Sequence, residues 1–292
     1  MKEKNSQFNE ISQAITKTQG ENFQVENYRS VSGGCINQGY KISGNGQTYF
    51  VKLNSATQVE MFGAEILGLQ QMFDTHTILI PKPICYGISG NSSYIVVEWL
   101  ELQSGGTQPW YEMGCKLAQM HLKGKNTQFG WDRNNTIGST PQINTWTNNW
   151  ADFFAQHRIG YQLKLAKRRG GNFPEINIVV ERVRNILKNH HPQASIVHGD
   201  LWSGNAAVTS SGEAVIFDPA TYYGDREVDI AMTELFGGFP SAFYRGYNEV
   251  WALDSDYTQR KNLYNLYHIL NHFNLFGGGY GSQAYNMIQQ IL

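Results

Sequence analysis

Three polar side chains in one stretch of the chain could together perform phosphoryl transfer. Asp200 follows His198-Gly199, Asn205 comes five residues after Asp200, and Asp218 comes eighteen residues after Asp200. A carboxylate can orient and deprotonate an acceptor hydroxyl, and an asparagine with an aspartate can hold Mg²⁺ on nucleotide phosphates. The sequence therefore predicts Asp200 as a catalytic base, and Asn205 and Asp218 as metal ligands.

The segments around these residues favour catalysis over an ordinary polar hairpin. Residues 194–197 are an apolar run that leads into the loop, and residues 206–208 and 214–217 are typical of short strands around a turn at Ser211-Gly212. Asp and Asn are common turn residues, so H-G-D-x-x-x-x-N alone would leave the hairpin alternative real weight. The presence of Asp218 at the end of the next expected strand favours the catalytic interpretation over the ordinary hairpin.

A lysine and a glutamate could bind the phosphates of a nucleotide. Lys52 ends the expected strand 49–52, where a lone lysine is usually only solvated. Glu65 lies on the next expected helix, where it could hold the ammonium over the α- and β-phosphates. Glu60 is a second candidate partner, because its neighbours do not settle the helix face. We favour the pair of Lys52 with Glu65.

A glycine-rich segment precedes this lysine. Gly33, Gly34, Cys35, Ile36 and Asn37 lie between two expected strands, and glycines let backbone N–H groups approach a phosphate closely. The segment does not match a Walker A loop, and by itself it would be a plain hairpin turn. Its place before Lys52 suits a nucleotide-covering loop. We expect Cys35 to be a small inert residue; the alternative is an oxidisable thiol.

Two further positions could contact the substrates. Glu98, Trp99 and Leu100 end the last N-terminal strand, where backbone groups can pair with the edge of an adenine, although an ordinary strand end is the alternative. Trp202 lies two residues after Asp200. Its indole could stack on a sugar-like acceptor or pack the loop onto the protein, and the sequence favours neither.

Composition bounds the class of protein. The chain has 292 residues, 41% hydrophobic and 16% charged, with 23 basic and 24 acidic residues and a net charge of −1. This balance gives no general attraction to nucleic acid or to an anionic membrane. Three widely spaced cysteines indicate a reducing compartment, and we find neither a signal peptide nor an apolar run of membrane-spanning length. We expect a cytoplasmic protein.

The order of the expected elements predicts an α+β, two-lobed, protein-kinase-like fold. The small N-terminal lobe, residues 1–100, should hold an antiparallel sheet with one main helix; the larger lobe, residues 101–292, should be helix-rich and carry the catalytic hairpin. Asn45-Gly46 is a strong hairpin signal. The remaining expectations are helices at 6–18, 57–74, 109–122, 147–168 and 175–190 and in 226–292, and strands at 84–87 and 93–100.

Two more polar residues could serve structure or catalysis. His121 is expected to be a structural histidine near a helix end. Asp229 lies near the start of a helix, where it could cap the helix or brace the catalytic loop, and both roles could hold.

These residues together resemble the fructosamine kinase (ketosamine-3-kinase) family, relatives of aminoglycoside phosphotransferases and choline kinases. The resemblance extends over nearly the whole chain. It rests on residues 33–37, 198–205, 217–220 and 223–232, and on a middle segment with Phe129-Gly130-Trp131, Ile137 to Gln142 and Trp150 to Phe154.

The resemblance implies an ATP- and Mg²⁺-dependent kinase that phosphorylates the 3-hydroxyl of ketosamines, free or protein-bound. It gives Asp200 as base, Asn205 and Asp218 as metal ligands, and Lys52 with Glu65 as the phosphate-binding pair. Asp225 stands where some members of the family carry a histidine, which leaves acceptor details open.

Two alternatives remain on sequence grounds. An aminoglycoside- or choline-type phosphotransferase would share the fold, and an aminoglycoside site should be acidic; Asp225, Glu227, Asp229 and Glu234 lie close together in the sequence. A nucleotide-binding pseudokinase scaffold would keep the fold without the chemistry, but the intact catalytic set argues against it. The oligomeric state is open.

Overall fold

The computed structural model describes residues 2–31 and 37–292. Gly33, Gly34, Cys35 and Ile36 of the expected nucleotide-covering loop lie outside the described residues. In the N-terminal part, five antiparallel strands pair in the order β1-β2-β3-β5-β4. They are β1 (Asn27–Val31), β2 (Gln38–Gly44), β3 (Gln47–Ser55), β4 (Pro83–Ser89) and β5 (Ser92–Glu98).

The hairpin expected at Asn45-Gly46 joins β2 to β3. Both residues have positive φ, 52° and 75°, as a two-residue hairpin turn of this kind requires. Because β-strand side chains alternate between faces, Val51 and Val96 pack under helix α1 (Lys2–Gln19), whereas Ile95 lies on the face that meets helix α2 (Val59–Phe73). The sheet is thus covered on both faces.

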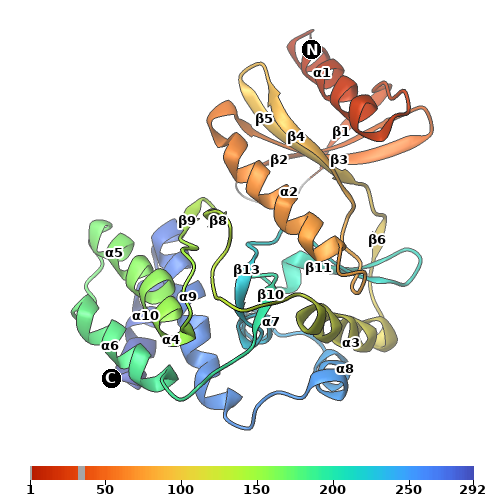
Figure 1. Ribbon diagram of the computed structural model, residues 1–292. Coiled ribbons are helices and arrows are strands. Elements are labelled where there is room, and N and C mark those ends of the chain that lie inside the picture. The colour runs from red at the N-terminus through yellow and green to blue at the C-terminus, as the bar shows by residue number, and fades with distance from the viewer. Residues whose placement is uncertain (1, 32–36) are drawn as a thin grey trace.

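The rest of the chain is mostly helical and lies below the sheet in Figure 1, with α2 facing it. Its helices are α3 (Thr107–Lys123), α4 (Trp150–Phe153), a π-helix (Phe154–Gly160), α5 (Tyr161–Arg168), α6 (Ile176–Leu187), α7 (Glu227–Leu235), α8 (Ser241–Trp251), α9 (Tyr257–Phe276) and α10 (Tyr280–Ile291). None of the described helices combines the length and apolar character needed to cross a bilayer.

Short strands carry the catalytic region. They are β6 (Leu102–Gln103), β7 (Lys125–Asn126), β8 (Asn135–Ile137), β9 (Thr140–Gln142), β10 (Ala194–Val197), β11 (Ala206–Thr209), β12 (Ala214–Ile216) and β13 (Tyr222–Asp225). β10 pairs with β13 and β7, whereas β11 pairs with β12 and β6, so the linker that leaves the N-terminal sheet is tied at β6 to the catalytic hairpin.

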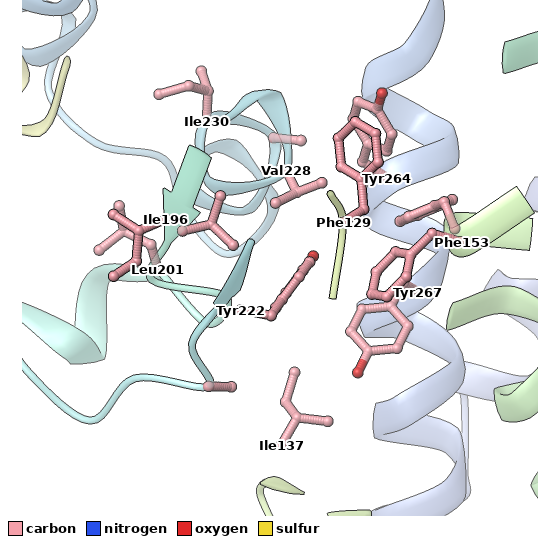
Figure 2. Close-up of a cluster of buried hydrophobic side chains, with 14 of the residues drawn as sticks. Phe129, Ile137, Phe153, Ile196, Leu201, Tyr222, Val228, Ile230, Tyr264 and Tyr267 are labelled. Atoms are coloured by element: carbon pink, nitrogen blue, oxygen red, sulfur yellow. The ribbon is translucent and has the colours of Figure 1, made fainter. Parts of the chain in front are cut away.

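A single hydrophobic cluster lies under the catalytic region and joins it to the helices. Figure 2 shows the ring of Tyr222 between the catalytic-loop residue Leu201 on one side and Tyr267 of α9 on the other, with Ile137 of β8 below. All four side chains are buried, each no more than 3% exposed. Catalytic loop, β13, β8 and α9 therefore share one core.

The structure confirms the two-lobed, kinase-like α+β arrangement and corrects details within it. The strand expected at 93–100 ends at Glu98, and the helix expected over 147–168 begins at Trp150 and contains the π-helix. The short strands β6, β7, β8, β9 and β13 were not expected. The lobe boundary between residues 100 and 101 stays a prediction.

Candidate active site

The catalytic loop begins with a backbone that only glycine tolerates well. Gly199 has φ of 81°, and a Cβ built on it would lie 2.2 Å from the carbonyl oxygen of Ala220. This close approach places Asp200 beside the segment that follows Asp218. The backbone N–H of Ala220 also donates to the carbonyl oxygen of His198, at 2.8 Å.

The amide of Asn205 joins the two expected partners. Its Nδ2 donates to the backbone oxygen and to Oδ2 of Asp200, at 2.8 and 3.2 Å, and more weakly to the backbone oxygen of Asp218, at 3.4 Å. This leaves Oδ1 of Asn205 without a hydrogen bond among the described residues. All three residues line one cavity of about 550 Å³. The structure therefore brings together the three residues that the sequence singled out.

The carboxyl group of Asp200 is unusually basic. The surrounding protein disfavours its charged form, and the neighbouring charge of Asp218 adds to this, so that the pKa of Asp200 rises to about 7 despite the hydrogen bond from Asn205. A general base works best with a pKa near the working pH. A cation bound beside Asp218 would oppose this rise.

Lys52 lies on the same cavity and contacts two carboxylates. Its Nζ donates to Oε1 of Glu65 at 2.7 Å and also to Oδ1 of Asp218. Burial lowers the pKa of Lys52, but the two carboxylates outweigh it and hold the pKa above its usual range. The competing partner, Glu60, instead pairs with Arg133 at the surface. The predicted Lys52–Glu65 contact is therefore present.

Asp229 braces the catalytic loop from below. Its carboxylate accepts the backbone N–H groups of His198 and Gly199, at 2.7 and 2.8 Å. His121, fully buried, lies 3.1 Å from the same carboxylate through Nε2 and 2.8 Å from the hydroxyl of Tyr247 through Nδ1. The bracing role considered for Asp229 is thus observed, and His121 is structural as expected.

Aromatic side chains form the wall of the cavity beyond Asp200. Trp202 is 39% exposed and lies over Gly204, where a Cβ would come 2.3 Å from the indole. Phe236 contacts Trp202 edge-on and also packs on His272, with ring centroids 6.4 and 4.8 Å apart. Tyr280 packs against His272 as well, with the two rings tilted by 52° and their centroids 5.1 Å apart. No local pattern marks Phe236, His272 and Tyr280 as neighbours, because the three rings come from separate elements: the end of α7, α9 and α10.

The expected adenine-binding residues do not line this cavity. The backbone N–H of Glu98 donates to Lys82, at 2.9 Å, and the indole N–H of Trp99 donates to Glu101, at 2.7 Å. Like them, Leu100 is not among the lining residues. The adenine contact stays a prediction. Asn37, the described end of the glycine-rich segment, does line the cavity.

Comparisons with known proteins assign the chain to a family. The family model for fructosamine kinases matches residues 7–292. The chain belongs to the fructosamine kinase family. A protein of Synechocystis named "Probable ketoamine kinase" is 59% identical, with 97% of this chain and 96% of that protein covered. An Arabidopsis thaliana protein named protein-ribulosamine 3-kinase, chloroplastic, is 41% identical, with 94% and 85% covered.

Solved structures with a similar fold include members of the fructosamine kinase family and more distant kinases. A candidate fructosamine-3-kinase from Haemophilus somnus has a TM-score of 0.91 and 33% identity, over 97% of this chain and 96% of that one. Aminoglycoside phosphotransferases and a choline kinase, at 12% to 15% identity, have TM-scores of 0.55 to 0.62. At that identity they support the fold alone. The fold is therefore two-lobed and kinase-like, and the family model and the relatives named above show the chain to be a kinase.

The residues of the family member fit a magnesium site in the cavity. Mg²⁺ prefers a few hard oxygen ligands and keeps several waters. Oδ1 of Asn205, which accepts no hydrogen bond among the described residues, and the carboxylate of Asp218, whose side chain is 44% exposed, offer such oxygens.

A second cluster of metal-capable side chains lies elsewhere. Among the described residues it consists of His190, Asp225 and Glu227. Its carboxylates are already occupied: Tyr264 donates to Asp225 at 2.6 Å, and Arg260 binds both oxygens of Glu227, at 2.8 and 2.9 Å. These groups complete one another without a metal.

Proposed function

We propose that the protein transfers the γ-phosphoryl group of ATP to the 3-hydroxyl of a ketosamine. The observation that carries this proposal is the convergence of Asp200, Asn205, Asp218 and Lys52 on one cavity in a chain of the fructosamine kinase family. The names of the relatives, ketoamine kinase and ribulosamine 3-kinase, support the choice of acceptor.

Each side chain has a defined task in this reaction. Asp200 accepts the proton of the acceptor hydroxyl as the phosphoryl group leaves ATP in line. Lys52, held by Glu65, neutralises charge on the phosphates. Asn205 and Asp218 hold Mg²⁺, which when bound neutralises charge that develops on the phosphate oxygens. Catalysis is then mostly positioning and charge neutralisation.

The described cavity argues against an aminoglycoside as acceptor. Such a polycation needs carboxylates around it, and the four acidic residues that are close in sequence do not provide them. Asp225 and Glu227 are buried with His190 and Arg260, Asp229 holds the loop, and Glu234 pairs with Lys261. None of the four lines the cavity.

The aromatic wall leaves a choline-like alcohol as a second candidate. Rings of Trp202, Phe236 and Tyr280 are the groups that bind alkylammonium ions in proteins. The same wall suits the apolar face of a sugar and the secondary ammonium of a ketosamine. Acceptor measurements must therefore include choline.

The decisive experiment is Mg²⁺-dependent ATP consumption by the purified protein with ribulose-lysine, fructose-lysine, kanamycin or choline. We expect turnover of the ketosamines and none with kanamycin. Turnover of choline or kanamycin alone would refute the acceptor while keeping the chemistry. No turnover with any acceptor would favour a scaffold role over catalysis. Location in the cytoplasm stays a prediction, and the choice between a free and a protein-bound substrate is open.

A further inference from the structure

Helix α2 carries Glu65, so its position decides whether Glu65 reaches Lys52. One face of α2 packs against residues 129–144 of the C-terminal part. This segment, which we name the strap, contains β8 and β9, and β8 contacts α2. Two sets of contacts matter here: those that fix the strap to the C-terminal part, and those that the strap makes to α2.

The strap is fastened to the segment that follows Asp218. Gly130 and Tyr223 exchange two backbone hydrogen bonds, of 3.0 and 2.8 Å. Nδ2 of Asn135 donates to the backbone oxygen of Thr221 at 2.8 Å. Both contacts lie within five residues of Asp218 along the chain, so strap and metal-binding aspartate are fixed to each other.

The far end of the strap is fixed by a buried arginine. Arg158, on the π-helix, has no exposed surface, and its Nη1 and Nη2 donate to the backbone oxygen of Ile143 and to Oδ1 of Asn144, at 2.6 and 2.7 Å. Its guanidinium lies over the rings of Tyr222 and Phe153, with centroid distances of 4.1 and 4.6 Å. Figure 2 shows these two rings side by side in the core. Arg158 therefore ties the strap to that core.

The strap and the segment fastened to it contact α2 at two points, one half-buried at Gln71 and one buried at Gly68. Nε1 of Trp131, whose side chain is buried, donates to Oε1 of Gln71 at 2.8 Å. At Gly68 the helix lies so close to Thr221 that a Cβ would be 2.7 Å from its hydroxyl oxygen. Residues 68 and 71 lie on one face of α2 because they are three apart. The exposed ion pair of Glu60 on the same face adds little.

We propose that Trp131 and Gln71 are positioning residues, through which the strap keeps Glu65 against Lys52 before any nucleotide binds. The series of contacts from Arg158 through the strap to α2 connects the helical C-terminal part to the N-terminal part. These two parts must come together around the phosphates of the nucleotide. This inference rests on the proposed function for its meaning in catalysis. The assembly of the Lys52–Glu65 pair can nevertheless be measured without an acceptor.

The test compares Gln71→Leu with Gln70→Leu. The side chain of Gln70 is exposed on the same helix and bonds only to Asp74 among the described residues, so the control loses one side-chain hydrogen bond at the same helix end, an exposed one that Gln70 donates to a carboxylate. Affinity for MgATP is measured by calorimetry without acceptor, and amide hydrogen exchange is followed over residues 59–73. We expect Gln71→Leu to bind MgATP about two- to tenfold more weakly, the worth of one neutral hydrogen bond, with faster exchange in α2. Equal behaviour of the two variants would overturn the proposal.

Two further variants separate positioning from general stability. Trp131→Phe keeps an aromatic ring but removes the same hydrogen bond, and it should weaken MgATP binding as Gln71→Leu does. In a Glu65→Gln background, Gln71→Leu should add little, because the group through which it acts is already altered. A full additive loss in that background would show a purely structural role. If ketosamines are not phosphorylated at all, the proposed function fails, while these binding measurements still decide the role of the strap.

Discussion

The carboxylate of Asp229 accepts a hydrogen bond from the backbone N–H of Gly199, at 2.8 Å, one residue before the proposed catalytic base. A second oxygen of the same group accepts the N–H of His198. Two consecutive backbone donors of the loop are thus fixed by one buried side chain of α7. The position of Asp200 depends on a residue that does not reach the cavity.

Asp229→Asn should damage both the loop and the stability of the protein. In asparagine an NH2 donor replaces one of the two acceptor oxygens. This donor would face another donor, the N–H of His198 or of Gly199, or would face His121. We expect a loss of about 1–3 kcal/mol in the free energy of unfolding, and a lower kcat with a smaller effect on ATP affinity. Urea unfolding and steady-state kinetics measure both. Glu234→Gln, on the same helix but away from the loop, should leave kcat nearly unchanged.

The same carboxylate should make stability depend on acidity. Burial alone would raise the pKa of Asp229, but the hydrogen bond and charge of His121, the charge of His198 and the backbone N–H of Gly199 lower it below its usual value. A lowered folded-state pKa contributes stability that is present above the unfolded-state pKa of about 4 and is lost as pH falls through the folded-state value. The stability difference between wild type and Asp229→Asn should therefore shrink below about pH 4. A difference that stays constant from pH 6 to pH 3 would contradict this assignment.

Gly199→Ala should impair catalysis far more than Gly212→Ala, which introduces a similar backbone strain. Gly199 and Gly212 have φ of 81° and 89°, so alanine costs about 1–2 kcal/mol of strain at either position. At Gly212 nothing lies within 4 Å of the new Cβ, whereas at Gly199 the Cβ meets the carbonyl of Ala220. We expect kcat to fall at least tenfold more in Gly199→Ala. Equal kcat values would mean that the close approach does not position Asp200.

Asp200→Asn should abolish turnover and spare nucleotide binding. The amide keeps the shape of the side chain but cannot accept the proton, and general base catalysis contributes about 10²–10⁴ in rate. We expect kcat to fall by at least that range, with MgATP affinity within about threefold of wild type. Single-turnover kinetics and calorimetry provide the two numbers. Near-normal turnover would refute the assignment of the base.

The role of Trp202 can be determined by comparing how its substitution changes the acceptor KM and the affinity for ATP. If its indole contacts the acceptor, Trp202→Ala should raise the acceptor KM about three- to tenfold, the worth of one aromatic contact, and leave ATP affinity unchanged. Trp202→Phe should recover part of the loss. A lower melting temperature with an unchanged acceptor KM would instead assign the indole to packing over Gly204.

Local signals sufficed for much of the site. The spacing of Asp200, Asn205 and Asp218 and the strand around Lys52 are set within a few residues, so their placement could be predicted. The choice between Glu65 and Glu60 needed only the helix face, and the structure settles it for Glu65.

The remainder depends on contacts between distant segments. Strands of two to four residues, such as β6 and β13, have no periodicity of their own and exist because a partner strand lies beside them. The aromatic wall joins Trp202 to Phe236 and His272 across separate elements. The burial of Arg158 is also hidden, because a basic residue in an amphipathic pattern is normally expected at the surface.

The buried anchor of Arg158 bears on how the enzyme responds to ionic strength. Its guanidinium is held by a carbonyl, an amide oxygen and aromatic rings with no solvent beside it, and mobile ions screen such contacts far less than exposed ones. The contacts that α2 makes through Gln71 and Gly68 involve no charged group. Added salt should therefore loosen the exposed Arg133–Glu60 pair and leave the Lys52–Glu65 geometry in place. A salt-dependent rate would then report the encounter with charged substrates, and not the assembly of the site.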